Sequence, residues 1–358
     1  MTCTFDYGYT KVRDLYAVAQ RPRKSAKATI SAIVVQGQKA VPTKRFWKSF
    51  FVRFGISDSV FRYFEPAEVF ERISERAPDD MLRYCLERDG GGPPQLLAVS
   101  HPNRDVIRYA EVLDLVSRYG GREPSYANGI VTSHHTPRSG DQPFQIGSDH
   151  FQHRFVLETP VDGFSHPKIY LSLLRQICAN GMVGYAPAFR SDVSLGKDIA
   201  HCIGRALETY DNGEGYAALR QRFESAQTSW ASVRECTQLY KSLIKVKGRK
   251  DLTSDTLLRD FYRMTGNLNE LYGLANLDAL SNKRQRVLPA RCRVYNLLNF
   301  ASEIATHHST PEGARSMQAC IGTLISDEYD LEGTAETATE FADFFVQSEN
   351  QAQRALVN

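Results

Sequence analysis

Two stretches of basic side chains are the strongest chemical signal in this sequence. In the first stretch, lysines and arginines stand among aromatic residues, and the second stretch lies much later in the chain. The members are Arg21, Arg23, Lys24, Lys27, Lys44, Arg45 and Lys48 in the first, and Lys245, Lys247, Arg249, Lys250, Lys283, Arg284 and Arg286 in the second. Single-stranded nucleic acid requires cations along its phosphates and rings on which its bases stack. We therefore predict that the chain binds nucleic acid, with single-stranded DNA as the expected form.

Charge is distributed unevenly along the 358 residues, although the formal net charge is only +3. Residues 1–60 hold 11 Lys/Arg and 3 Asp/Glu, a net +8, and residues 241–300 hold 12 and 5, a net +7. Residues 301–358 hold 2 and 10, a net −8. Such asymmetry indicates a polyanionic partner. The acidic tail, from Asp327 to Glu349, leaves two alternatives open: it neutralises the basic segments within the molecule, or it imitates DNA and binds a host or mobile-element protein.

Five histidines raise the question of a metal site. They are His134, His135, His150, His153 and His166, with Asp141 and Asp149 nearby. A metal ion needs at least three convergent ligands, whereas neighbouring residues of a strand point to opposite faces of the sheet. We therefore predict no metal, and a metal-dependent nuclease built on this cluster is a third hypothesis.

Motifs for nucleotide binding and covalent catalysis are missing. The run Leu195-Gly196-Lys197-Asp198 lacks the upstream glycine and the hydroxyl residue of a phosphate-binding P-loop. No motif ties a histidine or an acid to Cys178, so this cysteine reads as a small core residue. The sequence thus predicts a non-enzymatic protein without a cofactor and without catalytic residues.

The first basic set is expected to lie on an extended arm and on one helix. Residues 1–28 read as a polar, basic arm, and a strand is predicted at 29–35. Thr43 can cap a helix that ends at Gly55. On this helix an aromatic face is expected to dock on the core, with Arg45 and Lys48 on the outer side. The aromatic residues are Phe46, Trp47, Phe50, Phe51 and Phe54.

The middle of the chain alternates short apolar runs with turn residues. A helix is predicted at 68–76 and a hairpin from 82–87 and 95–100, with a helix as the alternative for 82–87, followed by a helix that begins near 106. Strands are predicted at 126–134, 149–158 and 188–195, with a strand or short helix at 168–179 and a turn at Asn180-Gly181. The predicted fold class is α+β, with an antiparallel β-meander core, flanking helices and a helical C-terminal region.

We expect three domains: a basic arm with an aromatic helix (1–60), an α+β antiparallel core (61–197) and a helical region with a basic loop and an acidic tail (198–358). In the last, apolar residues three and four apart predict one long helix over 216–244. Its seam packs against a neighbouring helix or a second subunit, so a homo-oligomer is one expected state. Further helices are predicted at 294–305, 315–325 and 335–346.

The location is predicted from what the sequence lacks. There is no run of 18 apolar residues, so a membrane is not an expected partner. The first 20 residues lack the apolar core of a secretory signal. Seven scattered cysteines, an odd number, indicate a reducing compartment. The expected location is the cytoplasm.

Two segments resemble one known family. The residues RQICANGM, over Arg175–Met182, with Cys178, Asn180 and Gly181, are similar to the signature of a phage- and plasmid-like protein family of unknown function, the domain of unknown function 932 family. The residues YNLLNFASE, over Tyr295–Glu303, resemble its later helix. The resemblance covers about residues 60–310 and implies a mobile-element setting among antirestriction and DNA-processing genes. The element order is also similar to that of Rad52-like strand-annealing proteins, which is an analogy of fold.

Overall fold

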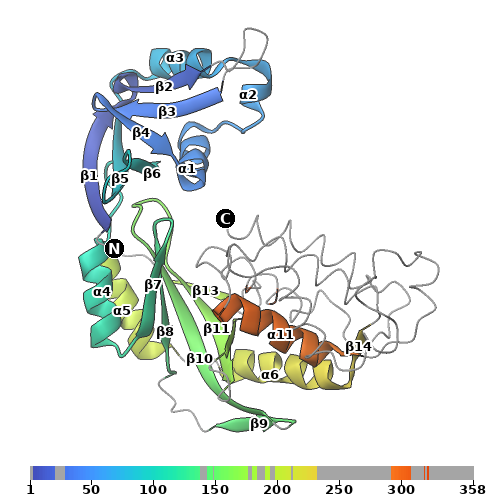
Figure 1. The fold of residues 1–358 in the computed structure, drawn as a ribbon. Coiled ribbons are helices and arrows are strands. Elements are labelled where there is room, and N and C mark those ends of the chain that lie inside the picture. Colours follow the sequence, from blue (N-terminus) through green and yellow to red (C-terminus); the bar gives the residue numbers. More distant parts are fainter. Residues whose placement is uncertain are drawn as a thin grey trace, which may run out of the picture.

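The computed structural model shows an α+β protein built on two main sheets (Figure 1). It describes residues 3–20, 29–137, 143–147, 149–175, 180–183, 190–193, 198–210, 213–231, 292–307, 318 and 321. The predicted fold class is confirmed for this part of the chain. None of its helices combines the length and the apolar character needed to cross a bilayer.

The N-terminal sheet has six strands in the order β1-β5-β6-β4-β3-β2. Neighbours are antiparallel except for β4 and β6, which are parallel. The bounds are β1 Cys3–Lys11, β2 Leu15–Gln20, β3 Thr29–Val35, β4 Gln38–Pro42, β5 Met81–Asp89 and β6 Gln95–Ser100, with a 3-10 turn at Val12–Asp14.

The predicted N-terminal arm is wrong for residues 3–20. These residues form β1 and β2, and β1 pairs with β5 along its whole length. The partner strand lies about 70 residues away in the sequence, as in the pair Thr10↔Leu82, and its pairing supplies hydrogen bonds that no local pattern reveals. The same sheet has strands on both sides of the predicted domain boundary at 60–61, so the described residues 3–20 and 29–100 form one unit.

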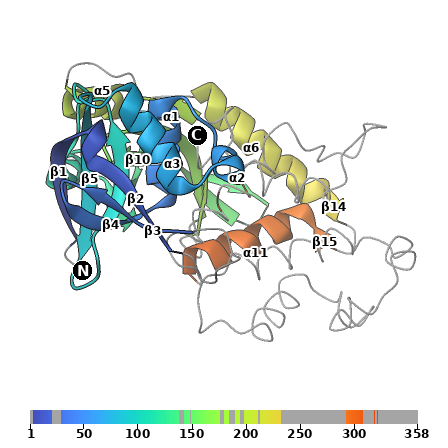
Figure 2. The same ribbon diagram turned by 90° about the horizontal axis from the view of Figure 1, so that it is seen from above.

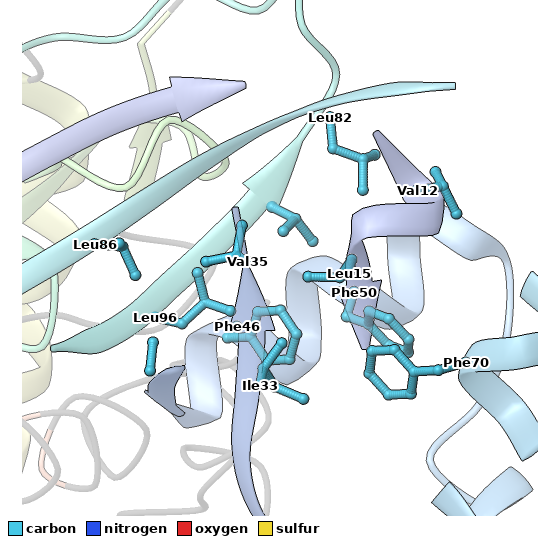
Figure 3. Packing of buried hydrophobic residues seen from close by; sticks show 12 residues of the cluster. Val12, Leu15, Ile33, Val35, Phe46, Phe50, Phe70, Leu82, Leu86 and Leu96 are labelled. Atoms are coloured by element: carbon cyan, nitrogen blue, oxygen red, sulfur yellow. The ribbon is translucent and has the colours of Figure 1, made fainter. Parts of the chain in front are cut away.

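The aromatic face of one helix packs into the core of this unit, as predicted, among mostly aliphatic residues (Figure 3). Helix α1 (Lys44–Phe54) begins at the Thr43 cap, whose Oγ1 accepts from the Phe46 amide, and ends at Gly55 with a φ of 64°. Phe46 and Phe50 are fully buried, and Phe50 stacks on Phe70 at 4.8 Å between ring centroids. The predicted helix at 68–76 is confirmed as α3 (Pro66–Arg76), and α2 (Val60–Tyr63) precedes it. This packing holds α1 firmly against the sheet.

The second sheet has the order β12-β11-β10-β8-β7, with β13 on β11 and β9 on β10. All its pairs are antiparallel. The bounds are β7 Arg122–Ala127, β8 Ile130–His135, β9 Phe144–Ile146, β10 Asp149–Pro160, β11 Lys168–Arg175, β12 Asn180–Val183 and β13 Arg190–Asp192.

Two turns in this sheet differ from the prediction. The single strand expected at 126–134 is the hairpin β7–β8, because Asn128 and Gly129 adopt positive φ of 47° and 79°. An Asn-Gly pair is a strong hairpin signal that the apolar pattern obscured. Conversely, the turn predicted at Asn180-Gly181 is wrong, because these residues begin β12 opposite Arg175 and Leu174.

Helices pack on this sheet in two pairs (Figures 1 and 2). Helix α4 (Tyr109–Arg118) contacts α5 (Ile199–Thr209), and α6 (Gly213–Thr228) contacts α11 (Val294–His307). The long helix predicted over 216–244 ends at Thr228, since β14 (Trp230–Ala231) follows and pairs with β15 (Cys292–Arg293). Residues 232–244 of the prediction lie outside the described residues. The predicted helix at 294–305 is confirmed. The helices predicted around 315–325 and 335–346 fall outside the described residues, apart from the helical positions 318 and 321.

Candidate nucleic-acid interface

The candidate site is built on the loop between β10 and β11. Asp162 organises this loop, because its Oδ1 accepts hydrogen bonds from the amides of Phe164 at 2.9 Å and Ser165 at 3.0 Å. Gly163 has a φ of 69°, and a Cβ there would lie 2.8 Å from Val106, so glycine is required on both counts. The Asp162 side chain is completely buried.

Arg45 of α1 binds the other carboxylate oxygen of Asp162. Its Nε donates to Asp162 Oδ2 at 2.9 Å, its Nη2 donates to the same oxygen, and Nη2 also donates to Ser165 Oγ at 2.9 Å. The predicted outward position of Arg45 is therefore wrong: only 16% of its side chain is exposed. The helix periodicity placed it opposite the aromatic face correctly, but that side of α1 faces the second sheet.

Three further cations lie around this ion pair. Lys48 follows Arg45 by one helical turn, Lys168 begins β11, and Arg104 lies between β6 and α4. Arg104 Nη2 donates to His166 Nε2 at 2.6 Å, and its guanidinium lies 5.5 Å from the Phe164 ring centroid.

Four cations gather at this junction: Arg45, Lys48, Arg104 and Lys168. Two buried carboxylates accompany them, Asp162 beside Arg45 and Glu158 opposite Lys168 in register. Burial, and then the charges of Lys168 and Arg45, lower the pKa of Lys48 to about 8. Burial also lowers the pKa of Arg104. An anion bound here would relieve both effects.

The junction is fixed by contacts between the two sheets. Tyr7 of β1 donates from Oη to the Val161 carbonyl at 2.6 Å, and Phe5 packs on Tyr109 and Tyr126 at 5.3 and 5.4 Å between ring centroids. Burial raises the pKa of Tyr7, so its hydroxyl stays a donor. In Figure 1, β1 descends to the second sheet beside α4. The loop carrying Asp162 is thus held between elements of both sheets.

The remaining predicted cations are placed as follows. Lys44 is exposed at the start of α1. The other members of both basic sets lie outside the described residues: Arg21, Arg23, Lys24, Lys27, Lys245, Lys247, Arg249, Lys250, Lys283, Arg284 and Arg286. The acidic tail and Cys178 also lie outside the described residues.

The two segments that carry the family resemblance meet in the structure. Arg175 Nη2 donates to Asp149 Oδ1 at 2.8 Å, and Tyr295 Oη donates to Asp149 Oδ2 at 2.7 Å. Asp149 is 5% exposed, so it is a buried carboxylate with partners on both oxygens. Helix α11 also contacts β12, which begins with Asn180 and Gly181. This cluster joins the last strands of the sheet to α11.

The histidines do not converge. His135 stacks on Phe155 at 5.2 Å between ring centroids, the His153 ring is tilted against Tyr216 at 4.5 Å, and His166 contacts Arg104. Within the described ranges, no three His, Cys, Asp or Glu side chains gather as a metal ion would require.

Sequence reasoning missed Asp162, Lys168 and Arg104 as members of one cluster. The Asp162-Gly163 pair indicated a turn, and nothing local marked it as the partner of Arg45, which is 117 residues away. Comparison with known proteins finds no matching family model, no matching curated protein and no matching solved structure.

Proposed function

We propose that this protein binds nucleic acid through the cationic junction between its two sheets, without catalysing a reaction. The observation that supports the proposal is the gathering of Arg45, Lys48, Arg104 and Lys168 from three separate segments around one buried carboxylate. Positive charge that is partly desolvated attracts phosphate groups more strongly than solvated surface lysines do.

The arrangement also assigns different tasks to the cations. Arg45 already has a carboxylate partner and holds the loop, so it positions the site. Lys48 is partly buried beside Lys168 and Arg45, so an added negative charge would favour its charged form. A mobile-element setting, as the family resemblance implies, is part of the same proposal, with strand protection or annealing as the expected role.

Equilibrium binding to a fluorescent oligonucleotide over a salt series tests the proposal. Lys48→Gln and Lys168→Gln should each weaken binding and reduce the slope of log K against log salt by about one. Lys39→Gln is the matched control, because Lys39 is an exposed lysine on β4. Urea unfolding of each variant checks that it folds.

Two results would contradict the proposal. One is no affinity of the wild-type chain for any oligonucleotide at low salt. The other is binding by Lys48→Gln and Lys168→Gln that equals that of Lys39→Gln.

Neutralising the basic residues at 245–250 in the same assay tests the second predicted set.

A further inference from the structure

The cationic junction continues onto the N-terminal sheet through Arg83 of β5. Arg83 Nη1 donates to the carbonyl of Arg104, and its Nη2 donates to the carbonyl of Pro102 at 2.7 Å and to Tyr9 Oη at 2.8 Å. Since Arg104 contacts His166 in the loop that Asp162 organises, a connected series of contacts runs from Tyr9 to Arg45.

Each end of this series carries an aromatic ring beside an arginine. The Arg83 guanidinium lies 5.3 Å from the Tyr9 ring centroid, and the Arg104 guanidinium lies 5.5 Å from the Phe164 ring centroid. Tyr9 is 50% exposed, unlike the fully buried rings of Phe46 and Phe50. Phe164 is partly exposed and its amide is held by Asp162.

These rings are held in place before any ligand binds. A single exposed tyrosine is ordinary on a protein surface. Tyr9 differs because its hydroxyl is bonded to an arginine that two backbone carbonyls also hold. A ring that is already ordered loses little conformational entropy when a flat partner stacks on it.

We infer that Tyr9 and Phe164, each beside its arginine, are stacking positions for unpaired bases, so that the ligand of the junction is a single strand rather than a duplex. This inference rests on the proposed function and adds to it the two residues on which unpaired bases would stack. Every base has a π-face, so stacking accepts any sequence, whereas the bases of a duplex are already stacked on their neighbours.

The test compares an oligothymidine with an abasic strand of the same length, which has the same phosphates and no bases. Tyr9→Leu should bind the oligothymidine about tenfold more weakly than the wild type does. Its affinity for the abasic strand should equal that of the wild type. Phe164→Leu should behave likewise. Tyr9→Phe keeps the ring and should retain most of the affinity. Tyr63→Leu is the matched control, because Tyr63 is 80% exposed on α2, outside this series of contacts.

The outcomes separate this inference from the proposed function. If the wild-type chain binds neither strand at low salt, both fail. If it binds both strands equally, or if Tyr9→Leu weakens both by the same factor, the stacking inference fails while the cationic site stands. Thermal unfolding of Tyr9→Leu and Phe164→Leu establishes that each variant is folded before its affinity is compared.

Discussion

Two basic residues of one helix, three positions apart, have different surroundings. Arg45 donates to a buried carboxylate and to Ser165. Lys48 is partly buried beside Lys168 and Arg45, and Asp162 only partly compensates for that repulsion. A guanidinium suits the first position because it donates several hydrogen bonds in a fixed plane, while a lysine can lose its proton when crowded.

The lowered pKa of Lys48 predicts that nucleic-acid binding depends on pH. Below about pH 8 this side chain is charged in the free protein, and above it the charge is lost. A bound phosphate would restore the higher pKa, so binding takes up a proton. Affinity should fall about tenfold between pH 7 and pH 9 at constant salt. Anisotropy titrations of wild type and Lys48→Gln measure this, and an equal fall in both would contradict it.

On the scale of elements, strand β8 holds two adjacent histidines that face opposite sides of the sheet. His135 lies on the same face as Phe155, where its Nδ1 donates to the Tyr119 carbonyl and Ser133 Oγ donates to its Nε2 at 2.9 Å. It is 2% exposed. Both side chains serve the packing of the sheet, and burial lowers the pKa of each.

Acid should therefore destabilise this sheet. The pKa of His135 is about 4 in the folded protein against 6.5 for an unperturbed histidine. Between these values the unfolded chain binds more protons, so the free energy of unfolding falls as the pH falls from 6.5 to 4. The loss from His135 is about 3 kcal/mol. His134 adds a loss in the same direction.

Urea unfolding at a series of pH values measures this loss. His135→Gln removes one titrating group and should flatten the decline between pH 6.5 and pH 4. His101→Gln is the control, because His101 is exposed. A decline of the same size in His135→Gln and in the wild type would contradict the prediction.

For the whole molecule, Asp162 matters most because it joins the two sheets. It pairs with Arg45 of the N-terminal unit and organises the loop of the second sheet. Removing one partner of a buried ion pair leaves the other charge uncompensated. The same carboxylate also offsets part of the positive charge at the proposed binding site.

Asp162→Ala should thus lower stability, because it leaves Arg45 unpaired and removes the acceptor that organises the loop. We expect the free energy of unfolding to fall by about 3 kcal/mol or more. Glu68→Ala, which removes the exposed Arg72–Glu68 pair of α3, should cost less than about 1 kcal/mol. Urea denaturation measures both losses. A loss for Asp162→Ala no larger than that of Glu68→Ala would contradict the assigned role.

Local patterns predicted individual elements well where the signal was strong. Helix α1 has the predicted Thr43 cap, Gly55 end and aromatic face, and β3 has the predicted bounds. Errors arose where distant pairing decides the structure. In β1, Phe5, Tyr7 and Tyr9 alternate with small or polar residues, a strand signal that was overlooked beside the basic residues that follow, and β5 and β3 pair with β1 and β2.

The candidate site depended on distant contacts even more. The sequence predicted a cationic surface and included Lys44, Arg45 and Lys48 in it. It could not pair Arg45 with Asp162 or bring Arg104 and Lys168 beside Lys48, because these contacts join residues far apart in the chain.

By itself the sequence determined the α+β class, the aromatic docking helix and the surplus of positive charge near the N-terminus, because capping residues, periodicity and composition are local properties. Only the tertiary structure decided which cation is neutralised by a carboxylate, which ring is left exposed, and which histidines are buried. The physical reason is that burial and electrostatic environment are set by the sum of all neighbours, and in this protein decisive neighbours are distant in sequence, as Asp162 is from Arg45.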